Sequence, residues 1–272
     1  MASVPKAFYF HAHANSLGGF LETPHKKVVP SQASVALPAV GGHASTRTEA
    51  FNCDEIVSCR AAYTRVTGAQ ADPDGPWSTL VTSVVEGLNI LETFKAERLV
   101  AQVTVEHPGD GGNPAISLAG CHFEGLKICG HDVSPTLNPK LLGVGSVDRI
   151  EWPIFQQTGR EQAVKMVAKA KASQGKTGQW VLNRFDWMTA AKAKTDGCVL
   201  CSLVDGIDQP FPGRAFGHAL EIPHFGKIFL GELLTCQSSI QLSMVRAELG
   251  CATTGNLSGA MAEVRGGTVP PT

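Results

Sequence analysis

The feature that most constrains this chain is a strict alternation of side chains in residues 8–14, FYFHAHA. Every second position there is apolar, at Phe8, Phe10, Ala12 and Ala14. The positions between them carry a tyrosine and two histidines, Tyr9, His11 and His13. Because successive side chains of a β-strand point to opposite faces, this spacing predicts a strand with one apolar and one aromatic-polar face.

Similar patterns recur along the chain and predict a mainly β protein. Residues 98–107 and 240–244 alternate in the same way, and residues 55–66 are extended in character. The turn sequence at 72–75, Asp-Pro-Asp-Gly, predicts a hairpin that leads into a further strand at 77–90. The 29 glycines and 16 prolines suit many turns between short strands.

Residues 159–193 differ from the rest because they are rich in helix formers, and they predict two short helices. Strand patterns resume at 198–204, so these helices form an insertion of about 152–195 rather than alternating with strands. That order argues against a parallel, doubly wound sheet. We therefore expect an antiparallel sandwich or a partly closed barrel with a short helical insertion near residues 159–193.

We expect one β-rich domain over residues 1–272, with two loop-rich stretches. Residues 15–50 carry seven prolines and glycines, and only 34–37 reads as a short extended piece. The tail at about 250–272 is predicted to be loop, with one short strand at 260–264.

Charge and hydropathy indicate a cytoplasmic protein that does not bind nucleic acid. Lysine plus arginine number 23 and aspartate plus glutamate 24, for a net charge of -1. No apolar run is long enough for membrane insertion, and residues 1–20 lack the apolar core of a secretory signal. The eight cysteines are expected to be free thiols in a reducing compartment.

The sharpest candidate for chemistry is the pair His11 and His13. Two histidines at positions i and i+2 of a strand project from the same face, which is one way that proteins supply two imidazoles to a metal. Zinc or another transition metal would need further ligands, and the sequence does not nominate them. A solvated or interface-facing strand explains the same residues.

Other motifs are incomplete and favour structural interpretations. Cys198 and Cys201 have CxxC spacing, but on a strand their sulfur atoms point to opposite faces. Four residues with metal-ligand chemistry, Cys121, His122, Cys129 and His131, are interpreted as core cysteines and surface histidines. Residues 175–177 and 143–145 lack the glycines of phosphate-binding and dinucleotide-binding loops.

No motif completes a catalytic set, so the sequence argues against an enzyme and for a protein without a cofactor. Our first expectation is a structural or assembly protein that forms a homo-oligomer through its strand surfaces. The first alternative is a metal-binding protein or metal-dependent enzyme centred on His11 and His13. The second alternative is a β protein that binds a small ligand.

Overall fold

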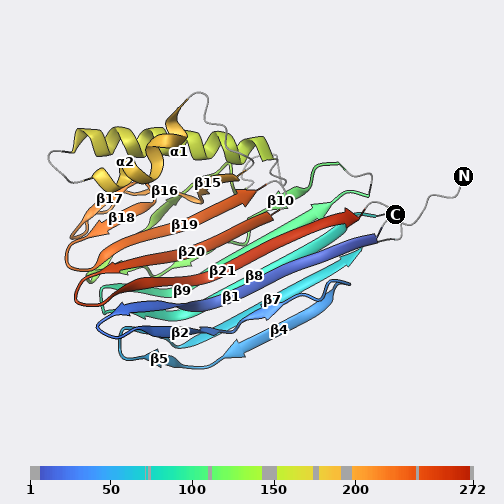
Figure 1. Cartoon of the computed structure of the whole chain (residues 1–272), viewed down its shortest axis with the longest axis horizontal. Helices are drawn as coiled ribbons and strands as arrows, with labels where there is room; N and C mark the ends of the chain where they lie inside the picture. Colours follow the sequence, from blue (N-terminus) through green and yellow to red (C-terminus); the bar gives the residue numbers. More distant parts are fainter. Residues whose placement is uncertain are drawn as a thin grey trace, which may run out of the picture.

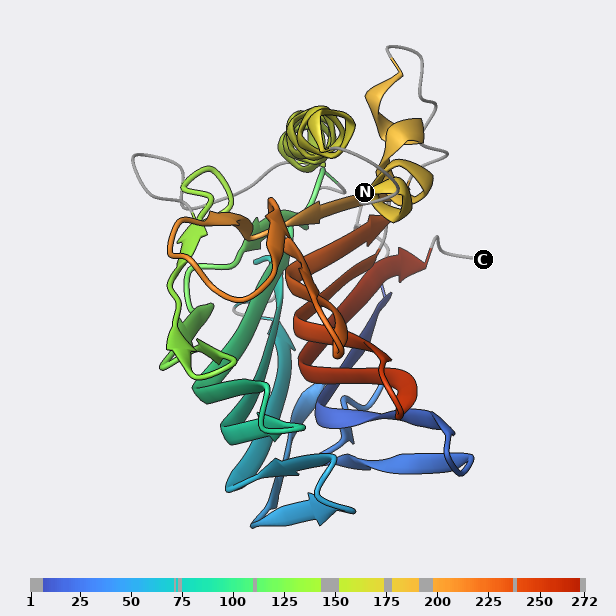
Figure 2. The same ribbon diagram turned by 90° about the vertical axis from the view of Figure 1, so that its left-hand side faces the viewer.

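The computed structural model describes residues 7–70, 72, 75–109, 112–142, 152–173, 178–190, 198–236 and 239–269. In this part of the chain, two antiparallel sheets pack face to face and a helical insertion lies at one edge (Figures 1 and 2). The expected mainly β, antiparallel sandwich with a helical insertion is confirmed. The helical segment at the amino end of the insertion is longer than expected, because one helix runs for 21 residues.

The first sheet is built from the two ends of the described chain. Its main strands lie in the order β17-β18-β19-β20-β21-β1-β2, with β15 beside β19 and β3 beside β1. Their bounds are β1 (Ala7–Thr23), β2 (Lys27–Gln32), β3 (Val35–Ala36), β15 (Cys198–Ser202), β17 (Arg214–Phe216), β18 (Ala219–Ile222), β19 (Gly226–Cys236), β20 (Ser239–Gly250) and β21 (Thr254–Val269).

The second sheet is formed by the intervening segments and centres on the long antiparallel strands β7, β8 and β9. Its strands are β4 (Gly42–Thr48), β5 (Phe51–Cys53), β6 (Val57–Cys59), β7 (Ala61–Gln70), β8 (Trp77–Ile90), β9 (Phe94–His107), β10 (Ala115–Ser117), β11 (His122–Glu124), β12 (Lys127–Ile128) and β13 (His131–Asp132). The expected hairpin joins β7 to β8. A small ladder pairs β14 (Pro135–Leu137) with β16 (Val204–Ile207).

The core lies between the two sheets and begins with the alternation of residues 8–14. Phe10, Ala12 and Ala14 are buried, and Phe8 packs against them beside Trp77 at a ring separation of 5.0 Å. Tyr9 and His11 lie exposed on the opposite face. The predicted apolar face of β1 is therefore the face that meets the second sheet.

In the first sheet, the alternation of core-facing and outward-facing side chains reverses along a line that crosses four strands. Gly231, Met244, Ala260 and Ser16 occupy adjoining register positions on β19, β20, β21 and β1. Gly231 (φ 60°) and Ala260 (φ 50°) adopt left-handed backbone conformations there. Because two successive residues then face the core, such as Met244 and Val245, every later side chain of the strand exchanges faces.

The helical insertion comprises α1 (Trp152–Ala172), α2 (Gln179–Phe185) and the 3₁₀ turn η1 (Asp186–Thr189). Figure 2 shows α1 above the edge of the sandwich and α2 on the side of the first sheet. Apolar residues of the helices form a second buried cluster with Phe216, Ala219 and Phe229 of the first sheet. The helices therefore cover the outer face of the first sheet near β17, β18 and β19.

Helix α1 is fixed to the edge strand β15 by an amide side chain. Gln162 donates from Nε2 to the carbonyl of Ser202 (2.8 Å) and accepts from its N–H (2.9 Å), as a neighbouring strand would. One helical turn earlier, a Cβ on Gly159 would lie 2.7 Å from the carbonyl oxygen of Leu200. The lack of a side chain at Gly159 thus permits the close approach of helix and strand.

Two expected loop regions are largely strands, so these expectations were wrong outside the two short strands that they included, at 34–37 and 260–264. In residues 15–50, β1 continues to Thr23 and is followed by β2 and β4. Proline is accommodated because Pro30 lies on the edge strand β2. In the expected tail, the 16-residue β21 lies between β20 and β1. Gly255 of β21 allows close approach to β1, because a Cβ there would meet the backbone of Phe20. Within the described residues, no helix has the length and apolar character needed to span a membrane.

Candidate functional site

The structure places His11 and His13 on the outer face of β1, as the alternation predicts. His13 Nε2 lies 3.0 Å from Ser34 Oγ. The register partners on β21 are Arg265 for His11 and Glu263 for His13, and these two partners form an ion pair with each other at 2.8 Å. No group of three or more His, Cys, Asp or Glu suited to a metal ion occurs in the described ranges. The metal site at His11 and His13 stays a prediction.

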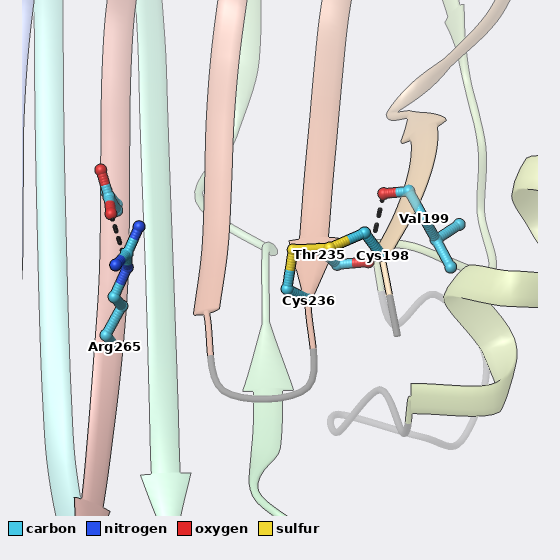
Figure 3. Close-up of a disulfide and its surroundings, with 6 residues drawn as sticks. Cys198, Val199, Thr235, Cys236 and Arg265 are labelled. Atoms are coloured by element: carbon cyan, nitrogen blue, oxygen red, sulfur yellow. Dashed lines mark hydrogen bonds and ion pairs between the residues drawn. A yellow bond between two sulfur atoms is a disulfide. The ribbon is translucent and has the colours of Figure 1, made fainter. Parts of the chain in front are cut away.

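Two cysteines form a disulfide, so the expectation of eight free thiols was wrong for Cys198 and Cys236. The two residues are direct register partners on β15 and β19, although 38 positions separate them in sequence. Beside them, Thr235 Oγ1 donates a 3.4 Å hydrogen bond to the carbonyl of Val199 (Figure 3). Cys201, the other half of the CxxC pair, is buried while Cys198 is exposed, as the strand geometry predicts.

The remaining sequence motifs do not assemble into a site. Cys121 is buried against the backbone of Gln102, and burial raises the pKa of its thiol to about 12, which keeps it protonated and unreactive. His122, Cys129 and His131 are exposed and do not converge with Cys121 on a metal position. The loop motifs at 175–177 and 143–145 lie outside the described residues.

A buried carboxylate on the outer face of the first sheet organises a different cluster. Glu232 of β19 is only 6% exposed. Its Oε2 accepts a 2.7 Å hydrogen bond from Arg246 Nε of β20, and its Oε1 accepts a 3.1 Å bond from Arg184 Nη2 of α2. His218 Nε2 lies 3.8 Å from Oε1. We call these four residues the Glu232 cluster, together with Glu248, which accepts a hydrogen bond from Arg246 Nη1, and Lys227, which lies beside Glu248.

The cluster keeps its central carboxylate ionised. Burial alone would raise the pKa of Glu232, but the adjacent His218 and Arg246 outweigh burial and lower the pKa to about 2. At neutral pH the carboxylate is therefore charged and held by two guanidinium groups. A carboxylate of such low basicity is a poor general base.

The ring of Phe229 makes cation–π contacts with both arginines. The guanidinium carbon of Arg246 lies 3.9 Å from the centroid of Phe229, its register partner, and that of Arg184 lies 4.6 Å from the same ring. One helical turn before Arg184, the ring of Trp180 lies 5.1 Å from Lys227 Nζ. Cation–π contacts of this kind position the cations and limit the alternative rotamers of the two arginines.

The cluster carries an excess of positive charge. Arg184, Arg246 and Lys227 contribute three cations, and Lys227 lies 3.6 Å from Glu248. Only Glu232 and Glu248 oppose them within the cluster. Arg184 Nη1 lies 3.8 Å from Glu248 Oε1, which is too far for a hydrogen bond. One N–H-bearing end of Arg184 is thus available to a further acceptor.

A hollow of about 290 Å³ lies directly beside the cluster. Its floor is the outer face of β19, β20 and β21, and α2 supplies one wall through Arg184. The lining residues are Arg184, Leu200, Glu232, Leu234, Gln241, Ser243, Arg246, Ser258 and Met261. We call this hollow the arginine pocket. It combines two guanidinium groups, polar side chains and an apolar wall.

A second hollow of about 550 Å³ lies at the turn between β18 and β19. It is lined by Arg214, Glu221, His224 and Lys227 together with backbone at Gly226 and Gly250. It is the more open of the two, and its side chains come from turns and from the sheet edge. The arginine pocket is therefore the better-defined candidate site.

The chain matches the model of one protein family, described as a domain of unknown function (DUF8256), over residues 8–236. The chain belongs to this family. The matched part of this family member ends at the last residue of β19, so it includes Arg184 and Glu232 but not Arg246 of β20. Neither the search of curated proteins nor the search of solved structures found a match.

Sequence reasoning missed the arginine pocket for a specific reason. Ile228 and Leu230 face the core, so an unbroken alternation along β19 would place Glu232 in the core as well. In β20, the same rule applied to Ile240 and Leu242 would place Arg246 in the core. Because the side-chain alternation reverses at Gly231 and Met244, Glu232 and Arg246 lie on the outer face instead. An isolated glycine within the strand pattern at 226–236 was the only local signal of this irregularity.

Proposed function

We propose that the protein binds a small anionic ligand in the arginine pocket and performs no chemistry on it. The observation that carries this proposal is the shared Glu232, which holds Arg184 and Arg246 side by side at the wall of a hollow of about 290 Å³. Preorganised guanidinium groups recognise anions with little loss of side-chain freedom. The low pKa of Glu232 favours binding over acid–base catalysis.

The test is a binding measurement on wild-type protein and on a variant in which the pocket is filled. Ser243 lies on the pocket floor and is partly exposed, so Ser243→Trp should occupy the hollow without removing a charge. Small carboxylates and phosphates are titrated by calorimetry. We expect at least one anion to bind wild-type protein and to lose about tenfold or more in affinity in the variant.

A matched control distinguishes the pocket from general surface charge. Arg65 is an exposed arginine on β7 of the second sheet, so Arg65→Gln should leave binding unchanged, whereas Arg184→Gln should weaken it. Circular dichroism and the thermal midpoint verify that each variant is folded. Failure of every anion to bind folded wild-type protein would overturn the proposed function.

A homo-oligomeric assembly role is a second candidate, and strand β4 favours it. Among the described strands, β4 pairs only with β7, and its seven residues contain neither proline nor lysine. The other long edge, β2, carries Lys27 and Pro30, which block strand addition. We propose that a second copy of the chain pairs with β4. Light scattering should then show a dimer or larger assembly that Ser45→Lys on β4 weakens and Val28→Lys on β2 does not.

A further inference from the structure

The charge of the Glu232 cluster limits which anion the arginine pocket can accept. Three cations, Arg184, Arg246 and Lys227, face two carboxylates, so one added negative charge balances the cluster. A dianion would bring a second negative charge close to Glu232 and Glu248. Because like charges repel strongly where water is partly excluded, the cluster favours a monoanion.

The donors also match a carboxylate. A planar guanidinium presents parallel N–H groups that fit two carboxylate oxygens, and Nη1 of Arg184 is not committed to a hydrogen bond with Glu248. Gln241, Ser243 and Ser258 line the same hollow and add neutral hydrogen-bond groups that carry no further charge. The polar side of the pocket thus suits one carboxylate group.

Three residues of the pocket lining are apolar. Leu200 and Leu234 are direct register partners on β15 and β19, and Met261 of β21 also lines the hollow. Leu234 is 44% exposed and is one of the few large apolar side chains that the described residues leave open to solvent. An aliphatic group of a ligand would cover this surface and release the water above it.

We infer that the ligand of the arginine pocket is a short-chain aliphatic monocarboxylate, whose carboxylate meets the arginines and whose chain covers Leu200, Leu234 and Met261. This inference rests on the proposed function. The volume of about 290 Å³ lies at the lower end of the range for small-molecule sites, so it limits the length of the chain.

Four probes separate the parts of this inference in calorimetric titrations of the full chain. They are hexanoate, acetate, hexyl phosphate and 1-hexanol. We expect hexanoate to bind about tenfold or more tightly than acetate, because its additional methylene groups contact the leucines. We also expect it to bind about tenfold or more tightly than 1-hexanol, which lacks the charge, and than hexyl phosphate, which carries excess charge.

Two variants assign these differences to the pocket walls. Leu234→Ser should reduce the preference for hexanoate over acetate about threefold or more while leaving acetate affinity unchanged. Arg184→Lys retains the positive charge but loses the planar fork, so it should weaken hexanoate and acetate alike. Leu234 is partly exposed, so Leu234→Ser is expected to fold; Arg65→Lys on the second sheet is the control for both.

The two proposals fail in different ways. If hexyl phosphate or 1-hexanol binds as tightly as hexanoate, and Ser243→Trp abolishes that binding, the monocarboxylate inference is wrong while the pocket remains a ligand site. If acetate binds as tightly as hexanoate, the role of the apolar wall is wrong. If none of the four probes binds but another small anion binds and Ser243→Trp abolishes that binding, only the monocarboxylate inference is wrong. If no small anion binds folded protein, both proposals are overturned.

Discussion

Arg246 Nε donates to Glu232 Oε2 at 2.7 Å, although the register of β19 and β20 pairs Arg246 with Phe229 and Glu232 with Ser243. The contact is therefore diagonal, and it spans the line at which the side-chain alternation reverses. Phe229 beneath Arg246 and the reversal at Gly231 together bring the two charges to the same face. The candidate site depends on this local irregularity of the sheet.

The ion pair predicts a loss of stability in acid. The pKa of Glu232 is lowered from 4.5 to about 2 in the folded protein, so the ionised carboxylate stabilises the fold above about pH 4.5. That contribution, on the order of 3 kcal/mol, should be lost as the pH falls through this window toward 2. Urea unfolding of wild type and Glu232→Gln between pH 2 and pH 6 measures it. A stability difference that stayed constant over that range would contradict the prediction.

Substitution of Gly159 tests the packing of α1 on β15. Alanine is the better helix former by about 1 kcal/mol, so Gly159→Ala would stabilise an unconstrained helix. Because its Cβ would lie 2.7 Å from the carbonyl oxygen of Leu200, we instead expect a loss of about 1–3 kcal/mol. Chemical unfolding measures the change, and Ala168→Gly at an exposed position of the same helix reports local propensity alone.

The disulfide predicts a thiol count. After denaturation without reductant, six thiols should react with a thiol reagent, and reduction should release two more. The double variant Cys198→Ser, Cys236→Ser should lose about 3–4 kcal/mol of stability, because the bridge closes a loop of 38 residues. Eight reactive thiols in unreduced protein purified under air would show that the bridge does not form.

The left-handed backbone at Gly231 predicts a position-specific sensitivity to alanine. Gly231→Ala should destabilise the fold by about 1–2 kcal/mol, because φ is 60° there and a Cβ would also lie 3.0 Å from that of Leu203. Gly206→Ala is the matched control, since a Cβ at Gly206 meets no atom within 4 Å. Thermal unfolding compares the two, and equal midpoints would argue against strain at the reversal.

Much of the fold could be predicted from the sequence where a strand has one uniform pattern. Phe10, Ala12 and Ala14 face the core as their alternation indicates, and the Asp72 turn joins β7 to β8 as its composition indicates. Of strand β21, only the part at residues 260–264 could be predicted in this way. Its glycines are typical of loops, yet in the structure Gly255 allows close approach to the backbone of β1.

The candidate site was less accessible to sequence reasoning than the fold. Arg184, Glu232 and Arg246 come from a helix and two strands, and no spacing rule connects residues separated in this way. Cys198 and Cys236 illustrate the same difficulty, because their pairing follows from the register of β15 on β19 and not from a local motif. Tertiary register determines both features.

The line through Gly231, Met244, Ala260 and Ser16 divides each of its four strands into two halves that obey opposite numbering rules. On β1 the core takes even positions up to Ala14 and odd positions from Leu17 onward; on β20 the exchange comes between Met244 and Val245. The side of the line therefore decides whether an even-numbered or an odd-numbered position of the strand faces the core, and so which substitutions disturb it. The strands behave as two short sheets joined end to end, and the junction places Glu232 and Arg246 on the outer face, where they line the arginine pocket.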